Sequence, residues 1–149
     1  MNIRLAEPDD VTALSGIVTA AYQKYIERIG KPPAPMLDDY AERVRGRTAW
    51  VAEMDGAIAG LIVLLPQDDH LLLDNVAVNP ARQGHGIGRA LMAFAEREAL
   101  RQGYTELRLY THETMTENLA MYPALGWQET GRGSQSGYVR VFFRKQIKP

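Results

Sequence analysis

Apolar residues change their spacing along the chain, and these changes divide it into helical and extended segments. In residues 11–26 the apolar side chains recur every three to four positions, which predicts an amphipathic helix. A glycine- and proline-rich loop at residues 30–35 ends that helix. The same helical spacing predicts three further helices, at residues 36–45, 87–101 and 115–125.

Extended segments have alternating or continuous apolar residues between turn signals, and the pair Asp55-Gly56 predicts a hairpin. Gly131-Arg132-Gly133-Ser134 is expected to form the loop between the last two strands. The β-α-α-β-β-β-α-β-α-β-β order predicts one α/β domain over residues 1–149, with a mixed, mostly antiparallel sheet flanked by helices. The predicted strands are residues 3–5, 48–53, 57–65, 71–78, 106–111, 127–130 and 138–144.

Composition and charge exclude several classes of function. The chain has 149 residues, of which 46% are hydrophobic and 23% charged, as expected for a globular domain with its own core. Its formal net charge of -1 gives no reason to expect a nucleic-acid or membrane partner. It has no cysteine, and its three histidines are not closely spaced, so we expect no disulfide and no metal site. No signal-peptide or membrane-span pattern is present, which predicts a cytoplasmic protein.

Three glycines, Gly84, Gly86 and Gly88, occupy alternate positions between a predicted strand and a predicted helix. The first N–H groups of a helix have no intrahelical partner and carry partial positive charge. Glycines let the backbone approach a phosphate closely. With Arg82 beside it, the segment from Gln83 to Gly88 favours a diphosphate site over a plain tight turn.

Two common phosphate motifs fit this loop less well. A P-loop needs Lys followed by Ser or Thr after its last glycine, whereas Gly88 is followed by Arg89-Ala90, which excludes it. A dinucleotide fingerprint needs Gly-x-Gly-x-x-Gly, and here the third glycine comes one position early, after a hairpin rather than a parallel unit. A nicotinamide-binding oxidoreductase is kept as a rival hypothesis.

Two motifs together resemble the GNAT N-acetyltransferase family. Gln83-x-x-Gly86-x-Gly88, preceded by Val76-Ala77-Val78-Asn79-Pro80, is similar to that family's acetyl-CoA signature. The segment from Asn118 to Trp127 is similar to its second signature, and the element order matches along essentially the whole chain. The resemblance implies the GNAT fold, a twisted sheet split between strands 4 and 5, with the pantetheine arm of acetyl-CoA in the opening.

The resemblance also implies which residues bind acetyl-CoA. Amides of the glycine loop would hold the pyrophosphate, and the strand backbone at Val76 and Val78 would pair with the pantetheine. Many members place an asparagine where this chain has Met115, so Asn118, one turn before Tyr122, is the candidate here. The expected cofactor-binding residues are Val76, Ala77, Val78, Arg82, Gln83, Gly84, His85, Gly86, Ile87, Gly88, Arg89, Asn118 and Tyr122.

Acetyl transfer from a thioester to an amine needs a neutral amine and a proton for the leaving thiolate, and we expect direct attack in a ternary complex. Tyr122 is the predicted general acid, because a phenol with a pKa of about 10 stays protonated at neutral pH; the alternative is a packing role. Asp74 is the candidate base if burial raises its pKa, and otherwise a polar residue on an exposed face. His112 and Glu113 are further base candidates.

The first two predicted helices and their loop are expected to line the site of the acceptor, a small-molecule or peptide amine. The expected substrate-binding residues are Tyr22, Tyr25, Ile26, Met36, Asp74 and Tyr110, with Tyr40 as a further wall candidate. The rival from another class is a non-catalytic coenzyme-A-binding module that regulates a partner. A homodimer is neither predicted nor excluded, because the sequence shows no pattern of exposed apolar residues that would form a dimer interface.

Overall fold

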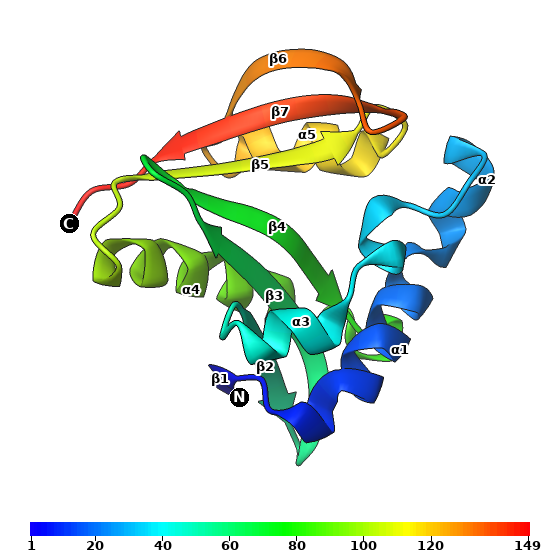
Figure 1. Cartoon of the computed structure of the whole chain (residues 1–149), viewed down its shortest axis with the longest axis vertical. Coiled ribbons are helices and arrows are strands. Elements are labelled where there is room, and N and C mark those ends of the chain that lie inside the picture. Colours follow the sequence, from blue (N-terminus) through cyan, green and yellow to red (C-terminus); the bar gives the residue numbers. More distant parts are fainter.

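A seven-stranded sheet in the order β1-β2-β3-β4-β5-β7-β6 runs through the molecule (Figure 1). The computed structural model describes all residues from 1 to 149. Neighbouring strands pair antiparallel except for β4 and β5, so the predicted mixed, mostly antiparallel sheet is confirmed. The strands are β1 (Asn2–Leu5), β2 (Ala49–Met54), β3 (Ala57–Pro66), β4 (Leu71–Val78), β5 (Glu106–His112), β6 (Gln128–Gln135) and β7 (Tyr138–Gln146).

Helices bury both faces of the sheet in two separate hydrophobic cores. Leu14 and Val18 of α1 pack with Val44 of α3 against one face, together with Leu61 of β3. On the other face, Leu91 of α4 belongs to a second core that also contains residues of α5, β5 and β7. The helices are α1 (Val11–Tyr22), α2 (Ile26–Ile29), α3 (Tyr40–Arg45), α4 (Ile87–Arg101) and α5 (Thr116–Ala124).

The strands β4 and β5 pair only at their beginnings. The parallel ladder joins Leu71 to Leu107 and Leu72 to Arg108, and no further pair follows. Beyond it the two strands diverge, as Figure 1 shows. The predicted opening between the fourth and fifth strands is therefore confirmed, and it leaves one edge of β4 without a strand partner.

A β-bulge at Asp74, halfway along β4, changes which face of the sheet the later side chains of this strand occupy. The register with β3 shifts at this point, and Asp74 has no partner across the ladder. Because strand side chains alternate between faces, one extra residue exchanges the faces that follow it. Leu73 belongs to the α4 side, whereas Asn75 bonds to Tyr22 and Tyr40 on the α1 side.

Two predicted helices have different bounds in the structure. The predicted helix over residues 11–26 is interrupted after Tyr22 by a 3-10 turn at Gln23–Tyr25, before α2. No proline or glycine marks this break, which coincides with tertiary hydrogen bonds made by the Tyr22 and Tyr25 hydroxyls. The second helix was expected over residues 36–45 but begins at Tyr40, because Asp39 stays extended and caps it by accepting from the Glu42 N–H.

The loop predicted at residues 131–134 is wrong, because these residues belong to β6. The turn lies further on, at Ser136 and Gly137, both with positive φ. Gly131 and Gly133 are tolerated in this edge strand, where most positions are exposed and no core side chain is required.

Gly60→Ala is expected to lower the free energy of unfolding by about 1–3 kcal/mol. A β-carbon at this position would lie 2.9 Å from the Ala77 carbonyl oxygen and 3.0 Å from Ile87 Cγ2, so β3 or α4 has to shift. Gly16→Ala in α1 is the matched control: its β-carbon meets nothing within 4 Å, and it should stabilise by about 0.5–1 kcal/mol. Denaturant unfolding measures both, and equal effects would contradict close packing of α4 on β3.

Candidate functional site

Two cavities meet where β4 and β5 separate. One, which we call the inner cavity, has a volume of about 60 Å³ and lies among β4, β5, β7 and residues 33–35. The other, which we call the groove, has about 610 Å³ and runs along the end of β4 to residues 82–89. At roughly 10–15 Å³ for one water, the inner cavity accepts only a compact group, whereas the groove accepts a long ligand. The residues that line both are Tyr22, Val76, Asn118 and Tyr122.

The glycine loop presents a run of unpaired main-chain donors to the groove. Gly84 and Gly86 have positive φ values of 85° and 76°, which other residues rarely adopt, and Gly86 is the N-cap of α4. The N–H of Gln83 donates to the Pro80 carbonyl (3.4 Å), and the next donor bonded within the protein is the N–H of Ala90, to Gly86 O (3.0 Å). The N–H groups of residues 84–89 are thus free to bind an anion at a helix N-terminus.

Most of the expected cofactor-binding residues line this groove. His85 does not: it is exposed, and its Nδ1 lies 3.0 Å from the carbonyl oxygen of Arg82. Arg82 is held by Asp55 (3.1 Å), whereas Arg89 is exposed and forms no ion pair. The residues that do line the groove are Val76, Ala77, Val78, Arg82, Gln83, Gly84, Gly86, Ile87, Gly88, Arg89, Asn118 and Tyr122.

Asn118 and Val76 occupy the junction between the two cavities with part of their hydrogen-bonding capacity in use. The Asn118 Nδ2 donates to Thr111 Oγ1 (3.1 Å), while its Oδ1 accepts no hydrogen bond within the protein. The Val76 carbonyl oxygen lies 3.1 Å from the Tyr22 hydroxyl, whose one proton also has Asn75 Oδ1 at 2.7 Å. A ligand in the groove therefore meets a free amide oxygen beside this main-chain carbonyl of β4.

Tyr122 combines a packed ring with an unbonded hydroxyl. Its ring contacts Trp127 and Phe143 at centroid distances of 5.9 and 5.6 Å. Only 5% of the residue is exposed, and burial raises the pKa of Tyr122 to about 12. The hydroxyl donates to no protein atom, yet no buried side-chain oxygen lacks both a partner and access to solvent. It is therefore available to a ligand where the two cavities meet.

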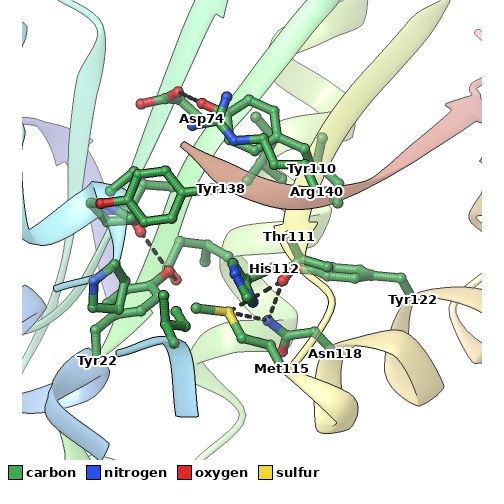
Figure 2. A pocket seen from close by; sticks show the side chains of 18 residues that line it. Tyr22, Asp74, Tyr110, Thr111, His112, Met115, Asn118, Tyr122, Tyr138 and Arg140 are labelled. Carbon is green, nitrogen blue, oxygen red and sulfur yellow. Dashed lines mark hydrogen bonds between the residues drawn. The ribbon is translucent and has the colours of Figure 1, made fainter. Parts of the chain in front are cut away.

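A carboxylate, a phenol and a guanidinium share one end of the inner cavity, as Figure 2 shows. The Tyr110 hydroxyl donates to Asp74 Oδ1 (3.1 Å), and the Arg140 guanidinium lies 4.1 Å from the Tyr110 ring centroid. Burial raises the pKa of Asp74 above its ordinary value, and the bond from Tyr110 opposes this in part. Burial also raises the pKa of Tyr110 to about 12.

Beneath this end, a chain of buried hydrogen bonds fixes the bulge of β4. The Tyr22 hydroxyl donates to Asn75 Oδ1 (2.7 Å), and Asn75 Nδ2 donates to the Tyr40 hydroxyl (2.9 Å). The Tyr40 hydroxyl donates in turn to the Pro35 carbonyl (2.5 Å). Tyr40 is thus a support under the wall rather than part of the lining, and it ties the bulge to the loop that covers the inner cavity.

The loop at residues 30–35 and the turn at residues 136–138 together form a cover over the inner cavity, which we call the roof. Lys31 Nζ donates to the Gly137 carbonyl (2.6 Å) and lies 4.1 Å from the Tyr138 ring centroid. The Tyr138 hydroxyl donates to the Pro32 carbonyl (2.7 Å). These contacts connect segments more than 100 residues apart, which no local sequence signal could reveal.

The remaining base candidates differ in their position. His112 lines the inner cavity, and the Thr114 N–H donates to its Nδ1 (3.1 Å), so the neutral ring carries its proton on Nε2. Burial lowers the pKa of His112, which favours this neutral form. Glu113 is exposed and lines neither cavity.

The expected substrate-binding residues are only partly brought together. Tyr22, Asp74 and Tyr110 line the inner cavity. Tyr25 faces the groove, where its hydroxyl donates to Glu117 Oε2 (2.9 Å). The remaining two residues line neither cavity: the break after α1 redirects Ile26, and Met36 packs against the core on the α1 side.

Arg140 and Tyr138 are lining residues that the sequence analysis missed. A signal was present for Arg140, because it stands between Val139 and Val141 in an otherwise apolar segment. Asp74 carries the same signal, a charged residue next to an apolar run in β4.

No helix is long and apolar enough to cross a membrane. No group of three or more histidine, aspartate or glutamate side chains is arranged to hold a metal ion.

Known proteins share both the sequence pattern and the fold. The sequence model of the acetyltransferase (GNAT) family matches residues 14–127. N-acetyltransferase family 8 member 3 of Rattus norvegicus is 38% identical over 88 residues, which cover 55% of this chain and 39% of that protein. This chain thus spans about two fifths of the length of that relative.

Solved structures extend the likeness of the fold over the whole chain. PaiA N-acetyltransferase from Thermoplasma acidophilum, in complex with coenzyme A, has a TM-score of 0.79 at 18% identity and covers 98% of both chains. The yncA protein of Salmonella typhimurium, with its cofactor acetyl-CoA, has a TM-score of 0.72 at 21% identity. It covers 100% of this chain and 95% of that one.

Asp74→Asn is expected to raise the melting temperature at pH 7. A carboxyl group whose pKa is raised on folding contributes stability below its unfolded pKa, near 3.8, and that stability is lost as pH rises through the folded pKa. Asparagine keeps an acceptor for Tyr110 without the buried charge, so its advantage should disappear as pH falls below 3.8. Melting curves across pH measure the difference.

Asp69→Asn is the control, because the pKa of Asp69 is shifted in the opposite direction: the hydrogen bond with His70 lowers the pKa of this exposed carboxyl. This variant should be no more stable than the wild type at pH 7. A lower melting temperature of Asp74→Asn at pH 7 would contradict the burial of that charge.

Proposed function

This chain belongs to the acetyltransferase (GNAT) family, and on that premise we propose that it transfers an acetyl group from acetyl-CoA to a primary amine. The observation that carries the proposal is the position of Tyr122. Its unbonded hydroxyl stands between a groove with free main-chain donors and a small polar cavity. A reaction that transfers a group from a long ligand to a compact one needs such a junction.

The groove fits coenzyme A in its donors and its shape. The free N–H groups of residues 84–89 suit the pyrophosphate, because they lie at the positive end of the α4 dipole. The unpaired edge of β4 suits the amides of the pantetheine arm, as an added strand would. Asn118 Oδ1 is a further free acceptor. When bound, acetyl-CoA supplies the activated acetyl thioester.

We assign Tyr122 the role of general acid. The amine attacks the acetyl carbon directly, and the carbon–sulfur bond breaks. The sulfur takes the proton of the Tyr122 hydroxyl, and the proton that the attacking nitrogen loses as the amide forms restores this hydroxyl. A pKa of about 12 keeps that proton in place over the whole physiological range. The chain has no cysteine that could form an acetylated intermediate, which agrees with direct attack in a ternary complex.

Asp74 is the proposed base on the acceptor side. The incoming ammonium has to lose a proton before it can attack. The Asp74 Oδ2 forms no hydrogen bond within the protein, so it is free to accept one from an amine in the inner cavity. A pKa raised by burial makes this carboxylate a stronger base than one on the surface.

Tyr122→Phe is expected to lower kcat by about 100-fold or more, because only the acidic hydroxyl is lost and the packed ring remains. The Kd of acetyl-CoA should stay within threefold, as a rough bound. Free-thiol release over an amine panel and calorimetry measure the two quantities. Tyr104→Phe is the matched control, since its hydroxyl bonds to the Gln67 carbonyl away from both cavities.

An unchanged kcat in Tyr122→Phe would remove the proposed acid. If the wild type binds acetyl-CoA but no amine on the panel releases thiol, the result favours the rival, a coenzyme-A-binding module that regulates a partner.

Gly86→Ala is expected to weaken acetyl-CoA binding by about tenfold or more, the equivalent of one lost charge-assisted hydrogen bond. Gly86 has a φ of 76°, and relief of the strain of a β-carbon there would reorient the free N–H groups. Gly103→Ala is the matched control, because its φ of 90° imposes a similar strain at the other end of α4. Equal changes of Kd in the two variants would contradict a cofactor site at the loop.

A further inference from the structure

Arg140 is the one buried arginine, and it has no carboxylate partner. It is 9% exposed, and no carboxylate oxygen lies within 4.0 Å of its guanidinium nitrogens. A guanidinium removed from water normally needs a counter-charge or a full set of acceptors. Each of the other arginines that are not exposed has a carboxylate within 4.0 Å: Arg4, Arg43, Arg82, Arg108 and Arg144.

The protein satisfies only part of this guanidinium. Arg140 Nη1 donates to Gln135 Oε1 (2.6 Å), and the Tyr110 and Tyr138 rings lie 4.1 and 5.8 Å from its central carbon. Contact with the ring faces offsets part of the lost hydration but accepts no hydrogen bond along the N–H directions. Nε and Nη2 bond to no protein atom, yet no buried side-chain nitrogen lacks both a partner and solvent access. These donors therefore remain open to a ligand in the inner cavity, which Arg140 lines.

The tyrosine that stacks on Arg140 also bonds to a carboxylate, Asp74, which has one oxygen free to accept a hydrogen bond. The Tyr110 ring stacks on Arg140, while its hydroxyl donates to Asp74 Oδ1 (3.1 Å), and Asp74 Oδ2 is unbonded. Figure 2 shows the three side chains together at one end of the inner cavity. The two charges are not within ion-pair distance of each other, so the cavity offers a separate anion site and cation site.

We infer that the acceptor is an amino-acid-like molecule, with a carboxylate beside its amine, and that Arg140 binds this carboxylate. The inference rests on the proposed function, because it names the class of amine at the same site. The planar guanidinium binds a carboxylate through two N–H groups at once, which fixes its orientation. With the carboxylate held there, the amine lies toward Asp74. The small volume of the inner cavity agrees with a compact zwitterionic head group.

The competing interpretation is that Arg140 serves only the protein, by offsetting the charge of Asp74 and packing between two tyrosines. That role would affect all amines alike. The carboxylate site affects only acceptors that carry the negative group, so matched pairs of acceptors separate the two.

The experiment measures kcat/KM by thiol release for alanine and ethylamine, leucine and isoamylamine, and phenylalanine and phenethylamine. Alaninamide is added as an isostere of alanine that lacks the carboxylate charge. Arg140→Met should lower the ratio of kcat/KM for the amino acid to kcat/KM for its matched amine by about 10- to 100-fold, the value of a charge-assisted hydrogen bond. Arg140→Lys should retain part of the preference, since it keeps the charge but not the fork. Comparing variants within each pair cancels differences in intrinsic amine reactivity.

Arg97→Met is the matched control, because Arg97 is an exposed arginine of α4 that forms no ion pair and lines neither cavity. It should leave both members of each pair unchanged. Melting curves and acetyl-CoA titration establish that the Arg140 variants fold. Should Arg140→Met fail to fold, Arg140→Lys and the wild-type preference for alanine over alaninamide decide the question.

Equal losses for both members of each pair, or a wild type that treats alanine and alaninamide alike, would overturn the inference while leaving acetyl transfer intact. Absence of thiol release with every amine would count against the proposed function instead. In that case calorimetric titration of the same pairs still tests the site. Amino-acid binding that disappears in Arg140→Met supports it, and no amino-acid binding by the wild type overturns it.

Discussion

The end of pairing between β4 and β5 after Leu72 is the constraint on which the site depends. Main-chain N–H and C=O groups cost free energy when they are buried without partners, so a strand edge inside a fold needs water or a ligand beside it. The free edge of β4 borders the groove, which provides that space. The same separation lets Tyr122 line both cavities, so under the proposed function the interrupted ladder supplies both the edge that binds acetyl-CoA and the position of the acid.

Two local irregularities at the ends of the site direct its polar groups. The bulge at Asp74 exchanges the faces of β4, so that Asp74 lines the inner cavity while Asn75 is tied down by Tyr22. At the far end, the left-handed backbone of Gly84 and Gly86 turns the chain into α4 with its amides unpaired. Each irregularity leaves groups unpaired within the ladder or helix, and each stands at the place where a ligand can use them.

Features governed by local signals could be predicted from the sequence, and features governed by distant contacts could not. The element order and the glycine loop depend on periodicity, turn residues and a strand-to-helix junction, all visible within short windows. The break after Tyr22 depends on contacts with β4 and α5, so the sequence could not show that Ile26 lies outside both cavities. Met36 lies outside them because it packs against the core on the α1 side. Arg140 reaches the inner cavity only because β7 pairs with β5.

The roof has a consequence for the range of acceptors. The contacts that join its two segments are a lysine against an aromatic face and two exposed hydrogen bonds, each worth about 1 kcal/mol or less. Local opening of such a segment costs much less than unfolding of the sheet beneath it. An acceptor larger than the inner cavity therefore binds at the small free-energy cost of displacing the roof. Under the proposed function, the preference for small acceptors then decreases gradually with acceptor size and has no sharp limit.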